Sequence, residues 1–160
     1  MLARKNLRLS QYDYSQPGAY FVTVCTEDRK NLLGSVVGGD AHIAPYTGLS
    51  PIGEVVQKYL QTIPGISYSV IMPNHVHMIL HISSTNVLQG PMWASAPTNT
   101  AVGKLVRSWK TLVTKELGYS IWQRSYYDHI IRNEKEYLQI AQYIEENPAK
   151  WCDDTYYSTV

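Results

Sequence analysis

The sequence predicts an α+β fold, with a ferredoxin-like antiparallel sheet and helices packed on it. Two observations support this fold class. Strand-like runs of β-branched and aromatic residues outnumber the helical segments, and turn residues join neighbouring runs into hairpins. A doubly wound parallel sheet would need a more regular alternation of strand and helix. The length of 160 residues, 44% of them hydrophobic and 17% charged, fits one folded domain.

The first part of the chain predicts a strand, a hairpin and a helix. Residues 19–26 (AYFVTVCT) are rich in β-branched and aromatic side chains, which is typical of a strand. The segment 27–49 contains short apolar runs separated by the turn sequence at 38–40, which indicates a hairpin. Ser50 can cap a helix that has Pro at its first position and apolar residues at a 3.6-residue period. Pro and Gly at 64–65 end this helix.

The middle of the chain predicts a strand pair and a loop. Residues 67–72 and 75–82 form either two strands or one bent strand interrupted at Pro73-Asn74. The segment 83–97 is polar and contains Gly and Pro, as loops do.

The last part of the chain predicts two helices around a strand. Thr98 or Asn99 can cap a helix over roughly 100–117, which has an apolar face. Residues 121–132 are expected to form a strand. Asn133 then caps the last helix, which ends before the next proline.

The bulk composition narrows the class of protein. Formal net charge is +1, from 14 basic and 13 acidic side chains, so any argument for nucleic-acid binding must come from local patches. The two cysteines, Cys25 and Cys152, form no CxxC pair. The sequence has no signal-peptide pattern and no apolar stretch near the roughly 20 residues of a membrane span. We therefore expect a cytoplasmic protein with reduced cysteines and no membrane partner.

A pair of histidines separated by one residue lies in the expected strand 75–82. Because side chains alternate between the faces of a strand, His75 and His77 share a face, with Cα atoms about 6.6–7 Å apart. That spacing lets both imidazoles reach one ion at about 2.1 Å from each nitrogen. The alternative is a surface strand with solvated histidines. His81 shares the face and has no assigned role.

The last helix offers a nucleophile and a third ligand. Tyr143 and Asn147 are four residues apart, so they lie on one side of a helix. A phenol can act as a nucleophile, and an amide oxygen can bind a hard divalent ion. The negative end of the helix dipole favours a cation there, and Glu146 is a competing ligand. Alternatively, Tyr143 is the edge of an ordinary core face and Asn147 only ends the helix.

Two motif blocks resemble a known family. "MPNHVHMI" followed by "WQRSYYDHIIRNEKEYLQIAQYIEENPAKW" resembles the single-tyrosine HUH transposases of the insertion-sequence 200/605 type. The resemblance is strongest to the REP-associated tyrosine transposase branch, and it covers about residues 19–151. We therefore divide the chain into a basic N-terminal arm (1–18), an HUH endonuclease domain (19–151) and a C-terminal tail (152–160).

The resemblance implies a chemistry and a substrate. His75 and His77 match the metal-binding pair, Asn147 matches the third ligand and Tyr143 matches the nucleophile. The family uses Mg²⁺ or Mn²⁺ to cleave and rejoin single-stranded DNA with hairpin ends through a 5′-phosphotyrosine intermediate. Such a protein would work at the bacterial nucleoid. Members of the family also pair, so a homodimer is an expected alternative to a monomer.

Basic side chains supply candidate DNA contacts. Lys104, Arg107 and Lys110 form a stripe on the expected helix 100–117, and Arg124 and Arg132 flank the strand before the last helix. These side chains could track phosphates, or they could form an ordinary solvated face. Two other functions stay open. One is a non-catalytic ferredoxin-like nucleic-acid-binding module, and the other is a metal-dependent hydrolase of small substrates.

Overall fold

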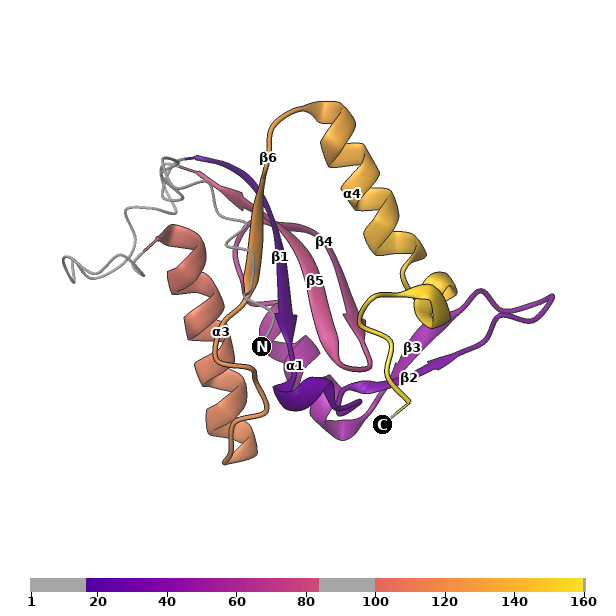
Figure 1. Cartoon of the computed structure of the whole chain (residues 1–160). Coiled ribbons are helices and arrows are strands. Elements are labelled where there is room, and N and C mark those ends of the chain that lie inside the picture. Colours follow the sequence, from indigo (N-terminus) through magenta and orange to yellow (C-terminus); the bar gives the residue numbers. More distant parts are fainter. Residues whose placement is uncertain (1–16, 84–99, 160) are drawn as a thin grey trace, which may run out of the picture.

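A four-stranded antiparallel sheet is the centre of the computed structural model, which describes residues 17–83 and 100–159 (Figure 1). Its strand order is β4-β5-β1-β6, and the strands are β1 (Gly18–Cys25), β4 (Ile66–Met72), β5 (His75–Ile82) and β6 (Tyr127–Ile131). In the described part of the chain, three α-helices accompany it, α1 (Pro51–Leu60), α3 (Ala101–Leu117) and α4 (Glu134–Glu146). The predicted α+β fold with a ferredoxin-like antiparallel sheet is confirmed.

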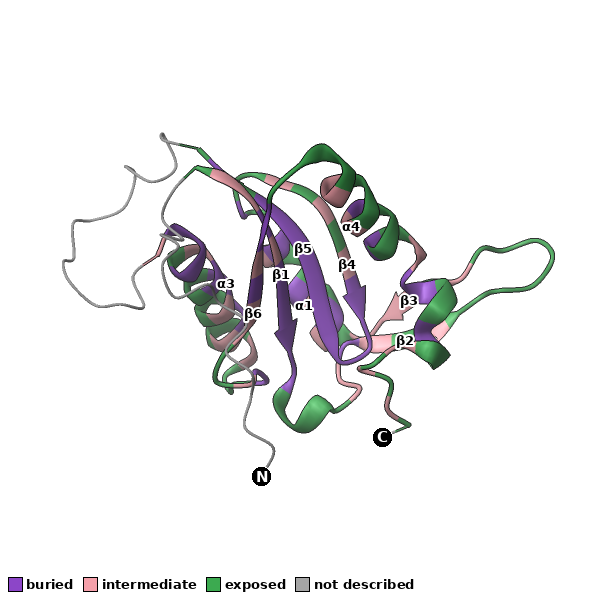
Figure 2. Ribbon diagram, turned by 45° about the horizontal axis from the view of Figure 1, so that its top comes forward, coloured by how far each residue is buried: buried purple, intermediate pink, exposed green. Residues whose placement is uncertain are grey.

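The larger core lies between the sheet and the helices α1 and α3 (Figure 2). Alternate residues of the two central strands are buried on this face, namely Tyr20, Val22, Val24, Val76, Met78 and Leu80. Trp109 of α3 fills the space between the helices, and its indole Nε1 donates to the carbonyl oxygen of Val56 over 3.3 Å. Burial of each such large side chain stabilises the fold by about 1.5–3 kcal/mol.

The opposite face of the sheet is covered by α4 (Figure 1). Ala141 and Ile144 of the helix pack on Ile79 and Ile131 of the sheet. These apolar contacts fix the helix over β4 and β5. The C-terminal end of α4 consequently lies at the end of β5 that carries the two histidines.

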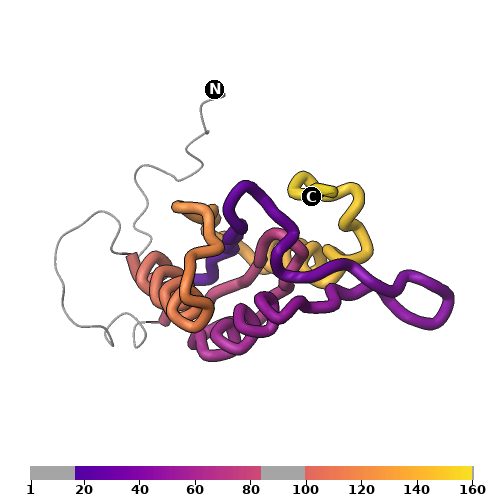
Figure 3. The backbone as a smooth tube through the Cα atoms, turned by 90° about the horizontal axis from the view of Figure 1, so that it is seen from below, coloured from indigo at the N-terminus to yellow at the C-terminus, as the bar shows by residue number. Residues whose placement is uncertain are grey.

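A separate two-stranded hairpin projects from the rest of the protein (Figure 3). It consists of β2 (Gly34–Val37) and β3 (Tyr46–Leu49), which confirms the predicted hairpin in 27–49. Gly38 and Gly39 begin its connection with φ of 84° and 92°, a left-handed conformation that glycine adopts without strain.

Helix caps account for where the helices begin. Ser50 and Asn133 cap α1 and α4 as predicted, with side-chain oxygens accepting from the backbone three residues later, over 3.0 and 2.9 Å. The predicted cap of the middle helix is wrong. Thr100 caps α3 instead, since its Oγ1 accepts from the Gly103 N–H over 3.0 Å. Thr98 and Asn99 lie outside the described residues.

The predicted strand 121–132 is shorter than expected. Only Tyr127–Ile131 pairs as β6, while Trp122 forms an isolated bridge with Thr26. Between them the chain leaves the ladder at Arg124 and Ser125, which are exposed. This break lets the edge of the sheet form the wall of a groove, described below.

Some expectations fall outside the described residues. The first 16 residues, with the basic side chains of the N-terminal arm, and nearly all of the expected loop 83–97 are among these. Within 17–83 and 100–159, no helix is long and apolar enough to cross a membrane.

Candidate metal and nucleophile site

The two histidines of β5 lie side by side beneath the C-terminal end of α4. Their ring centroids are 4.4 Å apart, as their shared strand face predicts. His75 is 0% exposed and His77 is 1% exposed. The alternative of solvated histidines on a surface strand is therefore wrong. Buried imidazoles need polar partners, and their partners indicate what the site can do.

The Nδ1 atom of His75 is held by the residue before it. Asn74 Oδ1 lies 2.8 Å from this nitrogen. Asn74 Nδ2 donates to the carbonyl oxygens of Arg29 and Tyr156, over 3.1 and 2.7 Å. Because the amide nitrogen is occupied as a donor, Oδ1 must accept, so Nδ1 of His75 carries the proton. The lone pair of neutral His75 is then on Nε2.

His77 is oriented in the same way from the neighbouring strand. Thr23 lies opposite His77 in the β1–β5 register, and its Oγ1 is 2.7 Å from His77 Nδ1. The hydroxyl oxygen can accept a hydrogen bond from a protonated Nδ1, and the lone pair of His77 is then on Nε2. An oxygen that accepts a hydrogen bond from the other ring nitrogen in this way commonly fixes the tautomer of a metal-binding histidine.

Tyr143 of α4 faces this pair. Its hydroxyl oxygen lies 3.3 Å from His77 Nε2, and its ring is 5.3 Å from the His77 ring. Phe21 supports the tyrosine ring edge-on at 6.2 Å. The side chain is nevertheless 41% exposed, so a substrate can approach the phenol from solvent.

Asn147 lies one turn later, also at the site, and is 1% exposed. Its Nδ2 donates to Asp154 Oδ2 over 2.9 Å. Its Oδ1 is buried and has no hydrogen-bond partner among the described residues. Glu146, the competing ligand, lies apart from the histidines and instead accepts from Lys150 and Gln142.

The donor set fits a divalent metal ion. Ligand atoms of His75, His77 and Asp154 all lie within 4.8 Å of one another. With metal–ligand bonds of about 2.1 Å, two ligand atoms on opposite sides of one ion are about 4.2 Å apart. Side-chain movements of a few tenths of an ångström would therefore bring the three ligand atoms within bonding distance of one ion. His75 Nε2, like Asn147 Oδ1, is buried without a hydrogen-bond partner in the part of the chain described. Unpaired buried acceptors are costly, and a bound cation would satisfy both.

Burial sets the protonation states of the site. It lowers the pKa of His75 to about 4, against the opposing effects of Asp154 and Asn147. Burial, with a smaller contribution from His75, also holds the pKa of His77 well below its usual range. Both imidazoles are therefore neutral near pH 7, which is the form that binds metals. Burial and then the Asp154 charge raise the pKa of Tyr143.

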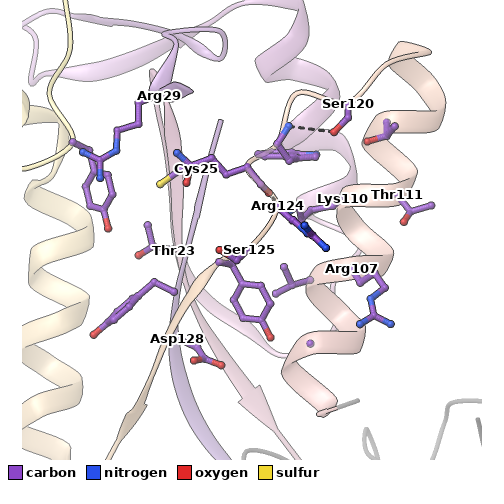
Figure 4. Close-up of a pocket in the computed structure, with 18 of the residues that line it drawn as sticks. Thr23, Cys25, Arg29, Arg107, Lys110, Thr111, Ser120, Arg124, Ser125 and Asp128 are labelled. Carbon is purple, nitrogen blue, oxygen red and sulfur yellow. Dashed lines mark hydrogen bonds between the residues drawn. The ribbon is translucent and has the colours of Figure 1, made fainter. Parts of the chain in front are cut away.

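A basic groove adjoins the site. It has a volume of about 920 Å³ and lies between α3 and the unpaired residues that precede β6 (Figure 4). Arg107, Lys110 and Arg124 line it, and so do Thr23 and Tyr156, which contact His77 and His75. The groove therefore combines cationic side chains with two residues that contact the histidine pair.

The predicted DNA contacts divide into two groups. Arg107, Lys110 and Arg124 line the groove, whereas Lys104 and Arg132 are exposed and do not. Lys110 Nζ donates to the carbonyl oxygen of Gln123 over 2.7 Å, and burial lowers the pKa of this amine.

Several residues of the site were not found by sequence reasoning. Thr23 and Asn74 hold the histidines, and Asp154 and Tyr156 come from the predicted tail 152–160. Asn74 directly precedes His75, which is a weak local signal. Asp154 gives none, because only the fold brings it to the strand.

Comparisons with known proteins agree with the resemblance of the two motif blocks. No family model matches the chain. An uncharacterized Haemophilus influenzae protein is 34% identical over an alignment 174 residues long, which covers 96% of this chain and 93% of the relative. A putative REP-associated tyrosine transposase of the same organism is 24% identical over 144 residues, covering 86% of this chain and 74% of the relative.

A solved structure shares the fold. It is described as a REP-associated tyrosine transposase bound to a REP hairpin, and the TM-score is 0.54 at 24% sequence identity. The likeness covers 89% of this chain and 73% of that chain. The sequence relatives and this structure together confirm the resemblance stated from the motifs.

Lowering the pH from 7 to 5 is expected to destabilise the metal-free protein by about 2 kcal/mol through His75, whose pKa in the folded protein is about 4, and to a further extent through His77. In the unfolded chain a histidine with a pKa near 6.5 binds a proton in this range, whereas buried His75 and His77 do not. Their contribution is complete above pH 6.5 and is lost as the pH falls towards 4. Urea unfolding at each pH, with a chelator present, measures the change.

His75→Gln should remove part of this pH dependence, and the matched change His42→Gln at an exposed position should leave it intact. An equal free energy of unfolding at pH 7 and pH 5 in the unmodified protein would show that the folded site accepts protons.

Proposed function

Because the chain belongs to the family of the REP-associated tyrosine transposases, we propose that it is an enzyme that cleaves and rejoins single-stranded DNA with hairpin ends. One observation carries the proposal. The Tyr143 hydroxyl oxygen lies 3.3 Å from His77 Nε2, beside the cluster of His75, His77 and Asp154 that could hold a metal ion. A nucleophile next to a divalent-ion site is the arrangement that phosphoryl transfer requires.

The ion in this proposal is Mg²⁺ or Mn²⁺. His75 Nε2, His77 Nε2 and Asn147 Oδ1 would hold it, since two of these atoms are buried without a partner among the described residues. When bound, the ion supplies positive charge that neutralises the oxygens of the scissile phosphate and lowers the pKa of the nearby phenol. Imidazole nitrogens favour Mn²⁺ over Mg²⁺ in affinity.

Tyr143 carries the covalent step. Its phenol loses a proton, and the Oη atom attacks the phosphorus in line with the 3′ oxygen of the preceding nucleotide. The Oη–P bond forms as the P–O3′ bond breaks, and the 3′ oxygen leaves and takes up a proton. The product is a 5′-phosphotyrosine link and a free 3′-OH. The reverse attack by a 3′-OH rejoins strands without ATP, because the ester bond is kept.

The basic groove is the proposed path of the DNA strand. Arg107, Lys110 and Arg124 can neutralise successive phosphates. Thr23 and Tyr156 of the groove contact the histidines, so a strand lying in it would bring a phosphate towards Tyr143. Lys104 and Arg132 lie outside it, and any contact that they make belongs to DNA beyond the groove.

The proposed site is complete within one chain. The Tyr143–His77 contact joins β5 and α4 of the same molecule. A homodimer is compatible with this arrangement but is not needed for it. Action on DNA would take the protein to the bacterial nucleoid.

Tyr143→Phe is expected to abolish a covalent protein–DNA adduct while binding of the DNA is retained. The ring and its packing on Phe21 remain, and only the nucleophilic oxygen is lost. The assay incubates protein, Mn²⁺ and a hairpin-bearing single strand, and detects the adduct by denaturing gel. A chelator should abolish the adduct of the unmodified protein.

Tyr137→Phe is the matched control on the same helix. Its hydroxyl bonds to Ser67 over 2.9 Å, outside the metal cluster, so its loss should leave the adduct unchanged. Three results would contradict the proposal. The adduct could survive Tyr143→Phe, the unmodified protein could form none and so be a non-catalytic binding module, or cleavage could persist without Tyr143, as in a hydrolase.

Arg124→Ala is expected to weaken binding of the same strand several-fold near 0.1 M salt. It should also reduce the slope of log Kd against log salt by about 0.7, because one single-strand phosphate contact is lost. Fluorescence anisotropy across a salt series measures both. Lys58→Ala removes an exposed charge on α1, outside the groove, and should change neither. Equal effects of the two changes would remove the groove from the proposed path.

A further inference from the structure

We propose that Asp154 is a ligand of the same metal ion, and that the ion thereby fastens the segment after α4 to the sheet. The inference rests on the proposed function only in assuming an ion at His75 and His77. It adds a ligand that neither the motif blocks nor the tyrosine helix contains. It also couples metal binding to the order of residues 152–159.

Charge is the first argument. Two neutral imidazoles and one amide supply no negative charge to a divalent cation. Burying an ion without a counter-charge is costly, and Mg²⁺ and Mn²⁺ prefer carboxylate oxygens. Among the described His, Cys, Asp and Glu side chains, Asp154 completes the cluster with His75 and His77.

The carboxylate is oriented by two donors. Asn147 Nδ2 donates to Oδ2 over 2.9 Å, and the Tyr156 backbone N–H donates to Oδ1 over 2.8 Å. A carboxylate oxygen has more than one acceptor direction, so each oxygen retains capacity for a metal bond. Since the carboxylate can only accept, the amide of Asn147 must turn its nitrogen towards Asp154. Its Oδ1 is then left for the ion.

The segment that carries Asp154 is held by contacts at both ends, including a hydrogen bond of 2.8 Å from Asn31 Nδ2 to the Ser158 carbonyl oxygen and the packing of Tyr157 on Trp151. The short helix η2 (Pro148–Asp153) leads into it, and Trp151 is buried. Beyond that, the Tyr156 ring packs 4.5 Å from the His75 ring, and the Tyr156 carbonyl oxygen accepts from Asn74. Residues 152, 153, 155, 157 and 159 are exposed. A metal bond from Asp154 would therefore add a direct link from this segment to the two histidines of β5.

Tyr156 connects the proposed metal site to the groove. Tyr156 lines the groove and contacts His75, and the Arg29 guanidinium lies over its ring, 5.1 Å from the centroid. A loaded site would hold Tyr156 in this position. The metal would thus shape the surface that a DNA strand meets just before the nucleophile.

Mn²⁺ binding to the full chain tests the inference without any reaction. Isothermal titration with MnCl₂ should show affinity reduced at least tenfold by Asp154→Asn, and Asp154→Glu should recover part of it. The matched control Asp153→Asn, an exposed neighbour, should stay within twofold of the unmodified protein. Hydrogen exchange followed by mass spectrometry should show Mn²⁺ slowing the amides of residues 152–159 in all of these proteins except Asp154→Asn.

Each outcome decides one claim. Unchanged Mn²⁺ affinity in Asp154→Asn overturns the inference and leaves the metal site of the proposed function intact. Loss of affinity with no effect of Mn²⁺ on exchange in the unmodified protein overturns the coupling. Failure of the unmodified protein to bind Mn²⁺ overturns the metal site of the proposed function. Circular dichroism of Asp154→Asn separates a lost ligand from a lost fold, and an unfolded variant passes the decision to Asp154→Glu.

Discussion

The antiparallel pairing of β1 with β5 is the interaction on which the rest of the site depends. Its register sets Thr23 opposite His77 and Cys25 opposite His75. Because side chains alternate, the same pairing buries Val76 and Met78 against α1 and α3 on the other face. A slip of one residue would exchange the two faces and send both histidines into the core. The apolar core therefore fixes the position of the histidines.

The site buries polar atoms without hydrogen-bond partners in the part of the chain described, which destabilises the fold. These unpaired atoms are the candidates for metal ligands. Polar groups that are buried without partners destabilise a fold. Here each Nδ1 has an oxygen partner, from Thr23 or Asn74, whereas His75 Nε2 and Asn147 Oδ1 have none among the described residues. The unpaired atoms face a common space beside Tyr143. The fold thus gives hydrogen-bond partners to the outer atoms of the cluster, and the unpaired inner atoms could bind an ion.

Local signals in the sequence were sufficient for much of the fold. Alternation along 75–82 predicted the shared face of His75 and His77, and the caps at Ser50 and Asn133 were readable because each depends on neighbouring residues. The four-residue spacing placed Tyr143 and Asn147 on one side of α4. These features need no knowledge of distant parts of the chain.

Features that depend on distant contacts were missed. The strand expected over 121–132 breaks at Arg124 because tertiary pairing, at Trp122 with Thr26, overrides its apolar pattern. Thr23 becomes a partner of His77 only through strand register. Asp154 reaches the site only because the chain turns back after α4, and its sequence context resembles that of an ordinary exposed acid. The groove was also missed, because its walls come from elements that are far apart in the sequence.

The central claim is that His75 and His77 hold a metal ion beside Tyr143 of the same chain. A crystal structure of the protein with Mn²⁺, with anomalous diffraction used to locate the manganese, tests it most directly. The account predicts an anomalous peak bonded to Nε2 of both histidines, with the Tyr143 hydroxyl of the same molecule facing it. A peak elsewhere with the histidine pair unliganded, or a tyrosine reaching the ion from another molecule, would contradict it.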